Sequence, residues 1–145
     1  MKKFNFQNIP LKVIQEENKI YIYDPLRKKR LLLTPEEEVR QKLIWYLMNE
    51  RGVPGGLIAL ERSLKINGLL KRFDLVVFNN SGSPYLAVEC KSPSVPLSQN
   101  VLQQLAVYNL HLKAEYLMVS NGLDHLISQV NFETREIQFL EDLPF

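Results

Sequence analysis

Two carboxylates and a lysine near the middle of the chain form a set that could do chemistry. Asp74 lies in one apolar run, and Glu89 and Lys91 lie in the next, on either side of Cys90. Carboxylate oxygens are ligands that Mg²⁺ prefers, and one or two of them commonly hold this ion while water and phosphate complete its shell. A nearby lysine can stabilise charge on a phosphate or orient an attacking water. The set therefore predicts a magnesium site that acts on phosphate.

Two predicted strands would bring these residues together. Segments 72–78 and 85–91 are rich in β-branched and aromatic residues, and a turn centred on Ser81-Gly82 joins them. The register that this turn sets places apolar residues on one face, where they should lie on the core. The apolar face pairs Phe73 with Cys90, Leu75 with Val88 and Val77 with Leu86. The other face pairs Asp74 with Glu89 and Arg72 with Lys91, and continues through Val76 and Ala87.

Two directly opposed carboxylates need a physical reason. Opposed residues in an antiparallel pair have Cβ atoms about 4.5 to 5.5 Å apart, and like charges there are destabilising. A divalent cation between Asp74 and Glu89 removes that repulsion. The alternative is a solvated strand face with crossed ion pairs, in a register that can slip by one residue. Val76 and Ala87 favour the site, because a fully exposed face would carry fewer apolar residues.

The remaining pattern predicts a mixed α/β domain. A first helix begins at Thr34-Pro35-Glu36-Glu37, with a cap, a proline at the first helical position and an acid three residues after the cap, and it ends near Arg51-Gly52. Asn67-Gly68 predicts a tight hairpin turn. A second helix carries Leu97, Val101, Leu105, Tyr108 and Leu112 on one side. Further strands are expected at 19–23, 57–66, 115–120, 127–132 and 136–140.

Asp74 followed by Glu89-Cys90-Lys91 resembles the D…(D/E)xK signature of the restriction-endonuclease-like, or PD-(D/E)XK, nuclease superfamily. More narrowly, the chain resembles the N-terminal nuclease domain of the type I restriction enzyme R subunit. Six ordered segments between about residues 20 and 123 carry this resemblance, and the set is much more specific than the short motif alone. They are Tyr23 to Lys29, Thr34 to Gln41, Lys71 to Val77, Glu89 to Pro93, Gln104 to Tyr108, and Ser120 to Gly122.

The resemblance implies both a fold and an activity. The fold is a central mixed sheet flanked by helices, with a core order of helix, three-strand meander, helix and strand. The activity is hydrolysis of DNA phosphodiester bonds with Mg²⁺ or Mn²⁺, in restriction or repair. Asp74, Glu89 and the backbone carbonyl of Cys90 would hold the metal. Lys91 would lie next to the scissile phosphate.

A glutamate of the first helix usually joins the metal shell in this superfamily, and Glu37 or Glu36 is the candidate here. Glu37 has an equally good alternative explanation, because a capping box with Thr34 would account for it completely. As a ligand, Glu37 must turn toward Asp74 and Glu89. As a cap, it must turn back toward the amide of Thr34.

Gln104 and Tyr108 lie one helical turn apart and match a QxxxY motif that borders the active centre in a subgroup of these nucleases. The alternative is that Tyr108 only packs with its apolar neighbours on the helix. Basic residues are expected to contact nucleic acid, although a solvated charge run is the commoner meaning of such a stretch. The candidates are Arg27, Lys28, Arg40 and Arg72.

Length and composition predict one domain over residues 1–145, with N-terminal strands in 1–33, a nuclease core in 34–123 and C-terminal strands in 124–145. The net charge of +2 is compatible with a polyanionic partner without requiring one. A single cysteine excludes an internal disulfide and favours a reducing compartment. No apolar run reaches the roughly 20 residues of a membrane span, so a cytoplasmic protein is expected.

The chain lacks a GxxxxGK[ST] loop, so we expect no motor of its own. DNA is the expected partner, together with separate restriction or repair subunits. A nuclease is the leading hypothesis. Its rivals are a binding module that keeps the nuclease fold with little cleavage, and a structural subunit whose carboxylates are incidental.

Overall fold

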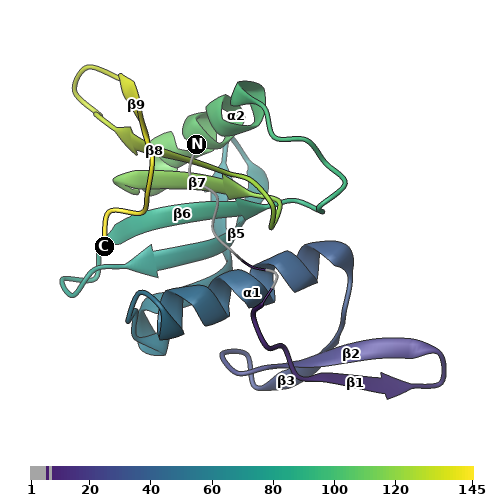
Figure 1. Cartoon of the computed structure of the whole chain (residues 1–145). Coiled ribbons are helices and arrows are strands. Elements are labelled where there is room, and N and C mark those ends of the chain that lie inside the picture. The colour runs from purple at the N-terminus through teal and green to yellow at the C-terminus, as the bar shows by residue number, and fades with distance from the viewer. Residues whose placement is uncertain (1–5, 7) are drawn as a thin grey trace.

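A six-stranded sheet with one helix on each face forms the centre of the computed structural model, which describes residue 6 and residues 8–145 (Figure 1). The strand order is β4-β5-β6-β7-β8-β9, and only the β6–β7 pair is parallel. The strands are β4 (Ile58–Ile66), β5 (Leu69–Phe78), β6 (Pro84–Cys90), β7 (Tyr116–Ser120), β8 (His125–Val130) and β9 (Ile137–Leu140). Mixed α/β architecture is therefore confirmed, and neither helix is long and apolar enough to cross a membrane.

Helix α1 (Pro35–Asn49) covers one face of the sheet. It begins as predicted, because Thr34 is the cap and its hydroxyl accepts a hydrogen bond from the amide of Glu37 at 3.1 Å. Its apolar stripe is buried against the sheet. The stripe consists of Val39, Leu43, Ile44 and Leu47, and it packs with Leu75, Val77, Leu86, Val88, Met118 and Ile127.

Helix α2 (Gln99–Leu112) covers the opposite face and connects β6 to the parallel strand β7. Leu102 and Leu105 are buried there, and the other residues of the predicted stripe pack against the same cluster. The strand residues of this second core are Phe73, Val76, Ala87, Leu117 and Val119.

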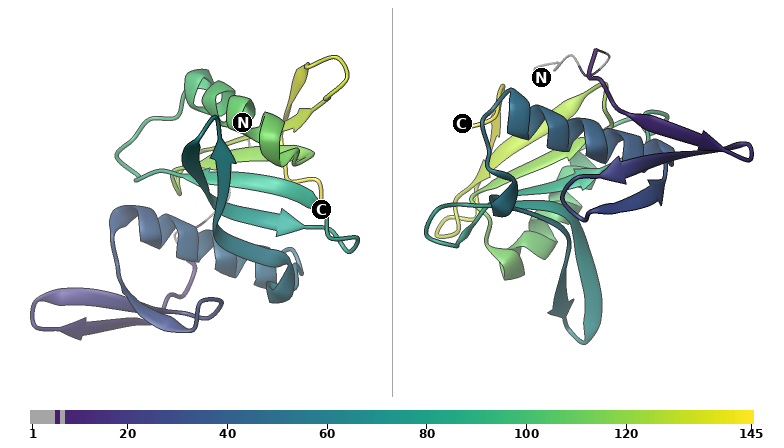
Figure 2. Two further views of the ribbon diagram at one scale, coloured as in Figure 1. Left: turned by 180° about the vertical axis from the view of Figure 1, so that it is seen from behind. Right: turned by 90° about the horizontal axis from the view of Figure 1, so that it is seen from below.

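Strands β4 and β5 form a long hairpin whose far end extends beyond the rest of the sheet (Figure 2). The predicted turn at Asn67-Gly68 is confirmed, with φ of 51° and 82° at its two residues. Both values lie in the left-handed region that a two-residue hairpin turn requires. Ile66 and Leu69 pair directly across it.

The predicted register of β5 against β6 is confirmed for Leu75–Val88 and Val77–Leu86, but the expected face of Phe73 is wrong. Phe73 packs under α2, although Leu75, two residues on, packs under α1. The strands are distorted between them, because Glu61 of β4 has φ 54° and the β4–β5 pairing skips Glu61 and Asp74. A local distortion of this kind interrupts the simple alternation of side chains along a strand.

A separate three-stranded antiparallel sheet precedes α1. It contains β1 (Val13–Glu16), β2 (Lys19–Asp24) and β3 (Lys29–Leu32). The sequence analysis expected strands within 1–33 but gave bounds only for the one that corresponds to β2. Strand β3 was not placed because the basic run from Arg27 to Arg30 hides the turn before it and its first residues. The predicted N-terminal region 1–33 also includes residues 1–5 and 7, which lie outside the described residues.

Candidate functional site

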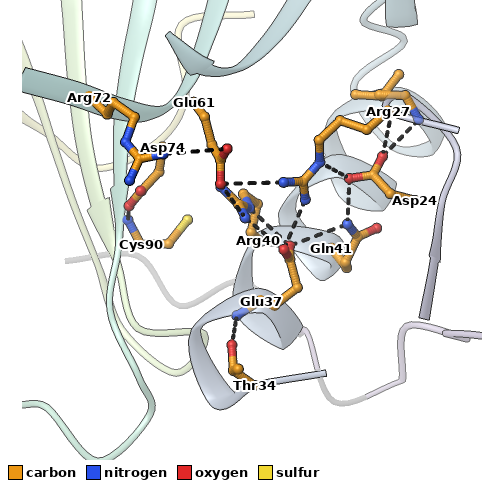
Figure 3. Close-up of polar contacts among 11 residues, drawn as sticks. Asp24, Arg27, Thr34, Glu37, Arg40, Gln41, Glu61, Arg72, Asp74 and Cys90 are labelled. Atoms are coloured by element: carbon orange, nitrogen blue, oxygen red, sulfur yellow. Dashed lines mark hydrogen bonds and ion pairs between the residues drawn. The ribbon is translucent and has the colours of Figure 1, made fainter. Parts of the chain in front are cut away.

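Asp74 lies in a cavity of about 160 Å³ beside the first turn of α1. One carboxylate oxygen accepts a hydrogen bond from the backbone amide of Cys90 at 2.7 Å (Figure 3). Burial raises the pKa of Asp74 above its ordinary value, although this hydrogen bond and the charge of Arg40 oppose the rise. The cavity is lined by Thr34, Glu36, Glu37, Arg40, Glu61, Asp74 and Cys90.

Glu89 lines a second cavity, of about 180 Å³, on the side of α2. Its Oε1 atom lies 3.5 Å from the ammonium of Lys91, whereas its Oε2 atom is buried and has no hydrogen-bond partner in the described part of the chain. Burial and the nearby charge of Asp74 raise the pKa of Glu89. A buried carboxylate oxygen without a partner is costly. A cation or a proton would satisfy it.

The two carboxylates interact electrostatically, but they do not share one open face as predicted. Asp74 faces the α1 side and Glu89 faces the α2 side, and the regular β5–β6 pairing ends at Leu75–Val88. Val76 and Ala87, expected on the polar face, are fully buried. Within residue 6 and residues 8–145, no group of three or more His, Cys, Asp or Glu side chains is arranged to hold a metal.

The donor set nevertheless fits magnesium in its chemistry. It offers hard carboxylate oxygens, one of them buried and unsatisfied, and Mg²⁺ usually keeps several waters instead of a full shell of protein ligands. The thiol of Cys90 is buried, and burial raises its pKa well above the ordinary value, which disfavours the thiolate that a metal would bind. Its backbone carbonyl as a ligand stays a prediction.

Lys91, Gln104 and Tyr108 are brought together in the Glu89 cavity. The structure adds Lys71, whose ammonium lies 4.5 Å from the centroid of the Tyr108 ring. This distance is within the range of a cation–π contact, so Tyr108 does more than pack against the core. Lys71 was not predicted as a site residue. The available signal was its place in the same strand as Asp74, three residues earlier.

Glu37 lies at the centre of a buried ion network and matches neither predicted role (Figure 3). Its carboxylate accepts hydrogen bonds from Arg40 at 2.6 and 2.9 Å and from Arg27 at 2.8 Å. The capping box is incomplete, because the amide of Thr34 donates to the carbonyl of Leu32 instead. Burial opposes ionisation of Glu37, but the hydrogen bonds and charges of the two arginines outweigh it and lower the pKa.

Glu36 is the acid of the first helix that remains available beside Asp74. It is exposed, it lines the Asp74 cavity, and its charge raises the pKa of Asp74. Among the residues that the structure describes, it forms no ion pair.

Two of the four expected nucleic-acid contacts are engaged within the protein. Arg27 binds Asp24 at 2.6 Å and Glu61 at 3.4 Å in addition to Glu37, and Arg40 is held by Glu37. Their guanidinium groups are thus paired with carboxylates within the protein, and their expected contact with nucleic acid stays a prediction. Arg72 is exposed and lies 3.8 Å from Glu61, and Lys28 is exposed on the β2–β3 turn.

Comparisons with known proteins agree with this architecture. A solved fragment assigned to the HsdR subunit of a type I restriction enzyme from Vibrio vulnificus superposes with a TM-score of 0.53 at 23% identity. The match covers 77% of this chain and 24% of that chain, so this chain spans about a quarter of the longer protein. No curated protein matches. The family model described as type I restriction enzyme R protein N terminus matches residues 35–144. Because this match covers most of the chain and confirms the resemblance seen in the motifs, the chain belongs to the family of type I restriction enzyme R protein N-terminal domains.

Proposed function

We propose that this chain is a magnesium-dependent nuclease that hydrolyses DNA phosphodiester bonds in a restriction system. The observation that carries the proposal is the environment of the Glu89 carboxylate. Its Oε2 atom is buried without a hydrogen-bond partner in the described residues, beside Lys91 and Lys71 and within electrostatic reach of Asp74. A carboxylate pair with adjacent ammonium groups suits a site that takes a cation and a phosphate together.

Each residue has a distinct proposed role. Asp74 and Glu89 hold the metal with the Cys90 carbonyl, and Glu36 takes the place expected of Glu37. Bound magnesium supplies Lewis-acid stabilisation of the phosphate and an activated water. Lys91 lies next to the scissile phosphate and stabilises the negative charge that develops on it.

Tyr108 holds Lys71 against its ring and so keeps a second positive charge in the Glu89 cavity. Gln104 is exposed on the lining of that cavity, where its amide can orient a phosphate oxygen or a water. The QxxxY pair therefore acts by positioning. The arrangement also explains why a tyrosine suits this position, because its ring both packs on the core and binds a cation.

The order of α1, the β4–β6 meander, α2 and β7 supports a restriction-endonuclease-like fold for this core. The long relative is described as a subunit of a type I restriction enzyme. We infer that this domain likewise works with other restriction subunits on DNA, and that any motor activity lies outside the sequence described here.

The test is incubation of the purified chain with supercoiled, linear and single-stranded DNA, in Mg²⁺, Mn²⁺ or EDTA. Cleavage is expected with either metal, none in EDTA, and none from Asp74→Ala in any condition. Equal cleavage by wild type and Asp74→Ala, or cleavage that persists in EDTA, would contradict the assignment.

A DNA-binding module with little cleavage is the second candidate. Two observations favour it. Asp74 and Glu89 line separate cavities, and the carboxylate of Glu37 is paired with two arginines. DNA binding in EDTA, combined with no cleavage in either metal, would establish the module and exclude the enzyme.

A further inference from the structure

The positive charge of this chain is concentrated at the outer part of the β4–β5 hairpin. Residues 62–72 contain Arg62, Lys65, Lys71 and Arg72 and no acidic residue. Of the 18 Lys and Arg residues, 14 therefore remain for the rest of the chain, against all 16 Asp and Glu residues. Outside this segment, the protein has a small negative net charge.

The end of the same hairpin is also apolar. Leu69 and Leu70 directly follow the Asn67-Gly68 turn and are 75% and 68% exposed. They are the two most exposed large hydrophobic side chains among the described residues. Neighbouring residues of a strand point to opposite faces, so the tip presents one exposed leucine on each face of the ribbon. Exposed apolar surface rimmed by polar residues commonly marks an interaction site.

The hairpin projects from the body of the protein (Figure 2). Its base contributes Glu61 and Asp74 to the lining of one cavity and Lys71 to the lining of the other. Cross-strand partners share a face, so Lys65 and Leu70 lie on one side of the ribbon together with Arg72. At the base of the ribbon, Arg72 approaches Glu61 of the Asp74 cavity. Lys71 lies on the opposite face and lines the Glu89 cavity.

We propose that residues 62–72 form a DNA-binding arm that enters the major groove of duplex DNA next to the cleavage site. A two-stranded β-ribbon fits the major groove, which is about 12 Å wide, and apolar side chains there contact thymine methyl groups. The basic side chains would bind phosphates and fix the register of the duplex. A protein partner is disfavoured, because lysine is depleted from the centres of protein interfaces.

This inference rests on the proposed function, since it gives the way in which the DNA substrate is held. Its first test measures duplex binding by fluorescence anisotropy in EDTA across a salt series. Lys65→Gln with Arg72→Gln should lower the slope of log affinity against log salt by about 2, since each phosphate contact contributes roughly 0.9. Leu69→Ser with Leu70→Ser should weaken binding by about tenfold, on the scale of one or two lost groove contacts, without changing that slope.

The matched control is Lys12→Gln with Lys19→Gln, two exposed lysines of the region around the three-stranded sheet. This pair should leave both affinity and salt slope at the wild-type values. Melting temperatures should stay unchanged in all variants, because the substituted side chains are exposed.

The second test locates the arm on DNA. Cys90 is the only cysteine and is buried, so Leu69→Cys introduces one accessible thiol for attachment of an iron–EDTA group. Strand breaks should cluster across one major groove, whereas the same label on Lys12→Cys should give no clustered breaks. Breaks clustered across a minor groove, or no clustering from Leu69→Cys, would refute the placement.

The experiments distinguish failure of the DNA-binding arm from failure of the proposed nuclease function. Wild-type affinity and salt slope in both hairpin variants, or no DNA binding by the wild type, overturn the arm. Leucine variants that change self-association in light scattering but keep DNA binding would also overturn it, and would identify the tip as a contact between copies. Failure of the nuclease shows instead as DNA binding without metal-dependent cleavage.

Discussion

At the residue scale, the two carboxylates of the proposed metal site are held in an environment that disfavours their charge. Burial raises the pKa of both Asp74 and Glu89, and Asp74 adds to the rise at Glu89. Glu37 shows the opposite behaviour, because paired arginines lower its pKa. Of these three acids, two have a charged form that burial disfavours, and one has a charged form that its arginine partners favour.

Lys91→Met should lower the cleavage rate by about two orders of magnitude or more, the usual scale for loss of an electrostatic stabiliser. Methionine keeps the apolar stem, so the melting temperature should barely move. Lys29→Met, in the three-stranded sheet, is the control for removing an exposed lysine. Wild-type cleavage by Lys91→Met would exclude a role for its charge in the reaction.

Glu36→Gln and Glu37→Gln should have opposite effects. Glu36→Gln should weaken Mg²⁺ binding in calorimetry and leave stability unchanged, since Glu36 is exposed beside Asp74. Glu37→Gln should destabilise the protein by about 1 to 3 kcal/mol, because it removes the buried carboxylate that the guanidinium groups of Arg27 and Arg40 share. If Glu37→Gln instead lost metal binding at full stability, Glu37 would be the ligand and Glu36 would not.

At the scale of elements, the network around Glu37 links three parts of the chain. Arg27, after β2, bridges Asp24 of that strand, Glu37 of α1 and Glu61 of β4. Gln41 completes the connection by donating to both Asp24 and Glu37. The network therefore ties the three-stranded sheet to the helix that borders the Asp74 cavity.

Acid should weaken this connection. The folded-state pKa values of Asp24 and Glu37 both lie below their ordinary values of 3.8 and 4.5. Their stabilisation is therefore complete above about pH 4.5 and is lost as the pH falls through the lowered values. The stability difference between wild type and Glu37→Gln, measured by urea unfolding, should be constant near neutrality and shrink below pH 4.5. A difference that persists unchanged at pH 2 would exclude the ionic origin.

At the scale of the whole molecule, the sheet separates two cavities, and the base of the β4–β5 hairpin lines both. Each cavity contains one carboxylate of the predicted pair, and the raised pKa values mean that ionising them costs folding free energy at neutral pH. Binding of a cation would recover that free energy, and would raise the stability of the folded state by mass action.

Magnesium should therefore raise the melting temperature of the wild type. Glu89→Gln should raise it in EDTA, since a neutral amide avoids the unfavourable ionisation, and should abolish the further increase with magnesium. A carboxyl group whose pKa is raised in the folded state destabilises the protein at pH values above that pKa. The neutral glutamine has no such ionisation, so it removes this loss of folding free energy. Glu133→Gln, which removes the charge of an exposed acid that follows β8, is the control for charge change alone. An equal magnesium shift in wild type and Glu89→Gln would exclude Glu89 from the metal site.

The amino-acid sequence by itself determined the type and order of most elements. Helix α1, the Asn67-Gly68 turn and the paired segments of β5 and β6 follow from capping residues, turn residues and apolar periodicity, all of which are local. The sequence also revealed the family and the set Asp74, Glu89 and Lys91, because the spacing of a motif can be read directly along the chain. Strands β1 and β3 were not placed, and for β3 the reason is that its basic residues outweigh its short apolar part.

Only the tertiary structure decided how the site is arranged. The left-handed backbone of Glu61 interrupts the alternation beside Asp74, so a register that is correct further along the strand misplaces Phe73 and the carboxylate pair. Lys71 meets Tyr108, and Arg27 meets Glu37 and Glu61, across separations that no local pattern encodes. Local preferences set what each segment becomes. Packing of segments distant in the chain sets which charges meet, and hence which acid remains available to bind a metal.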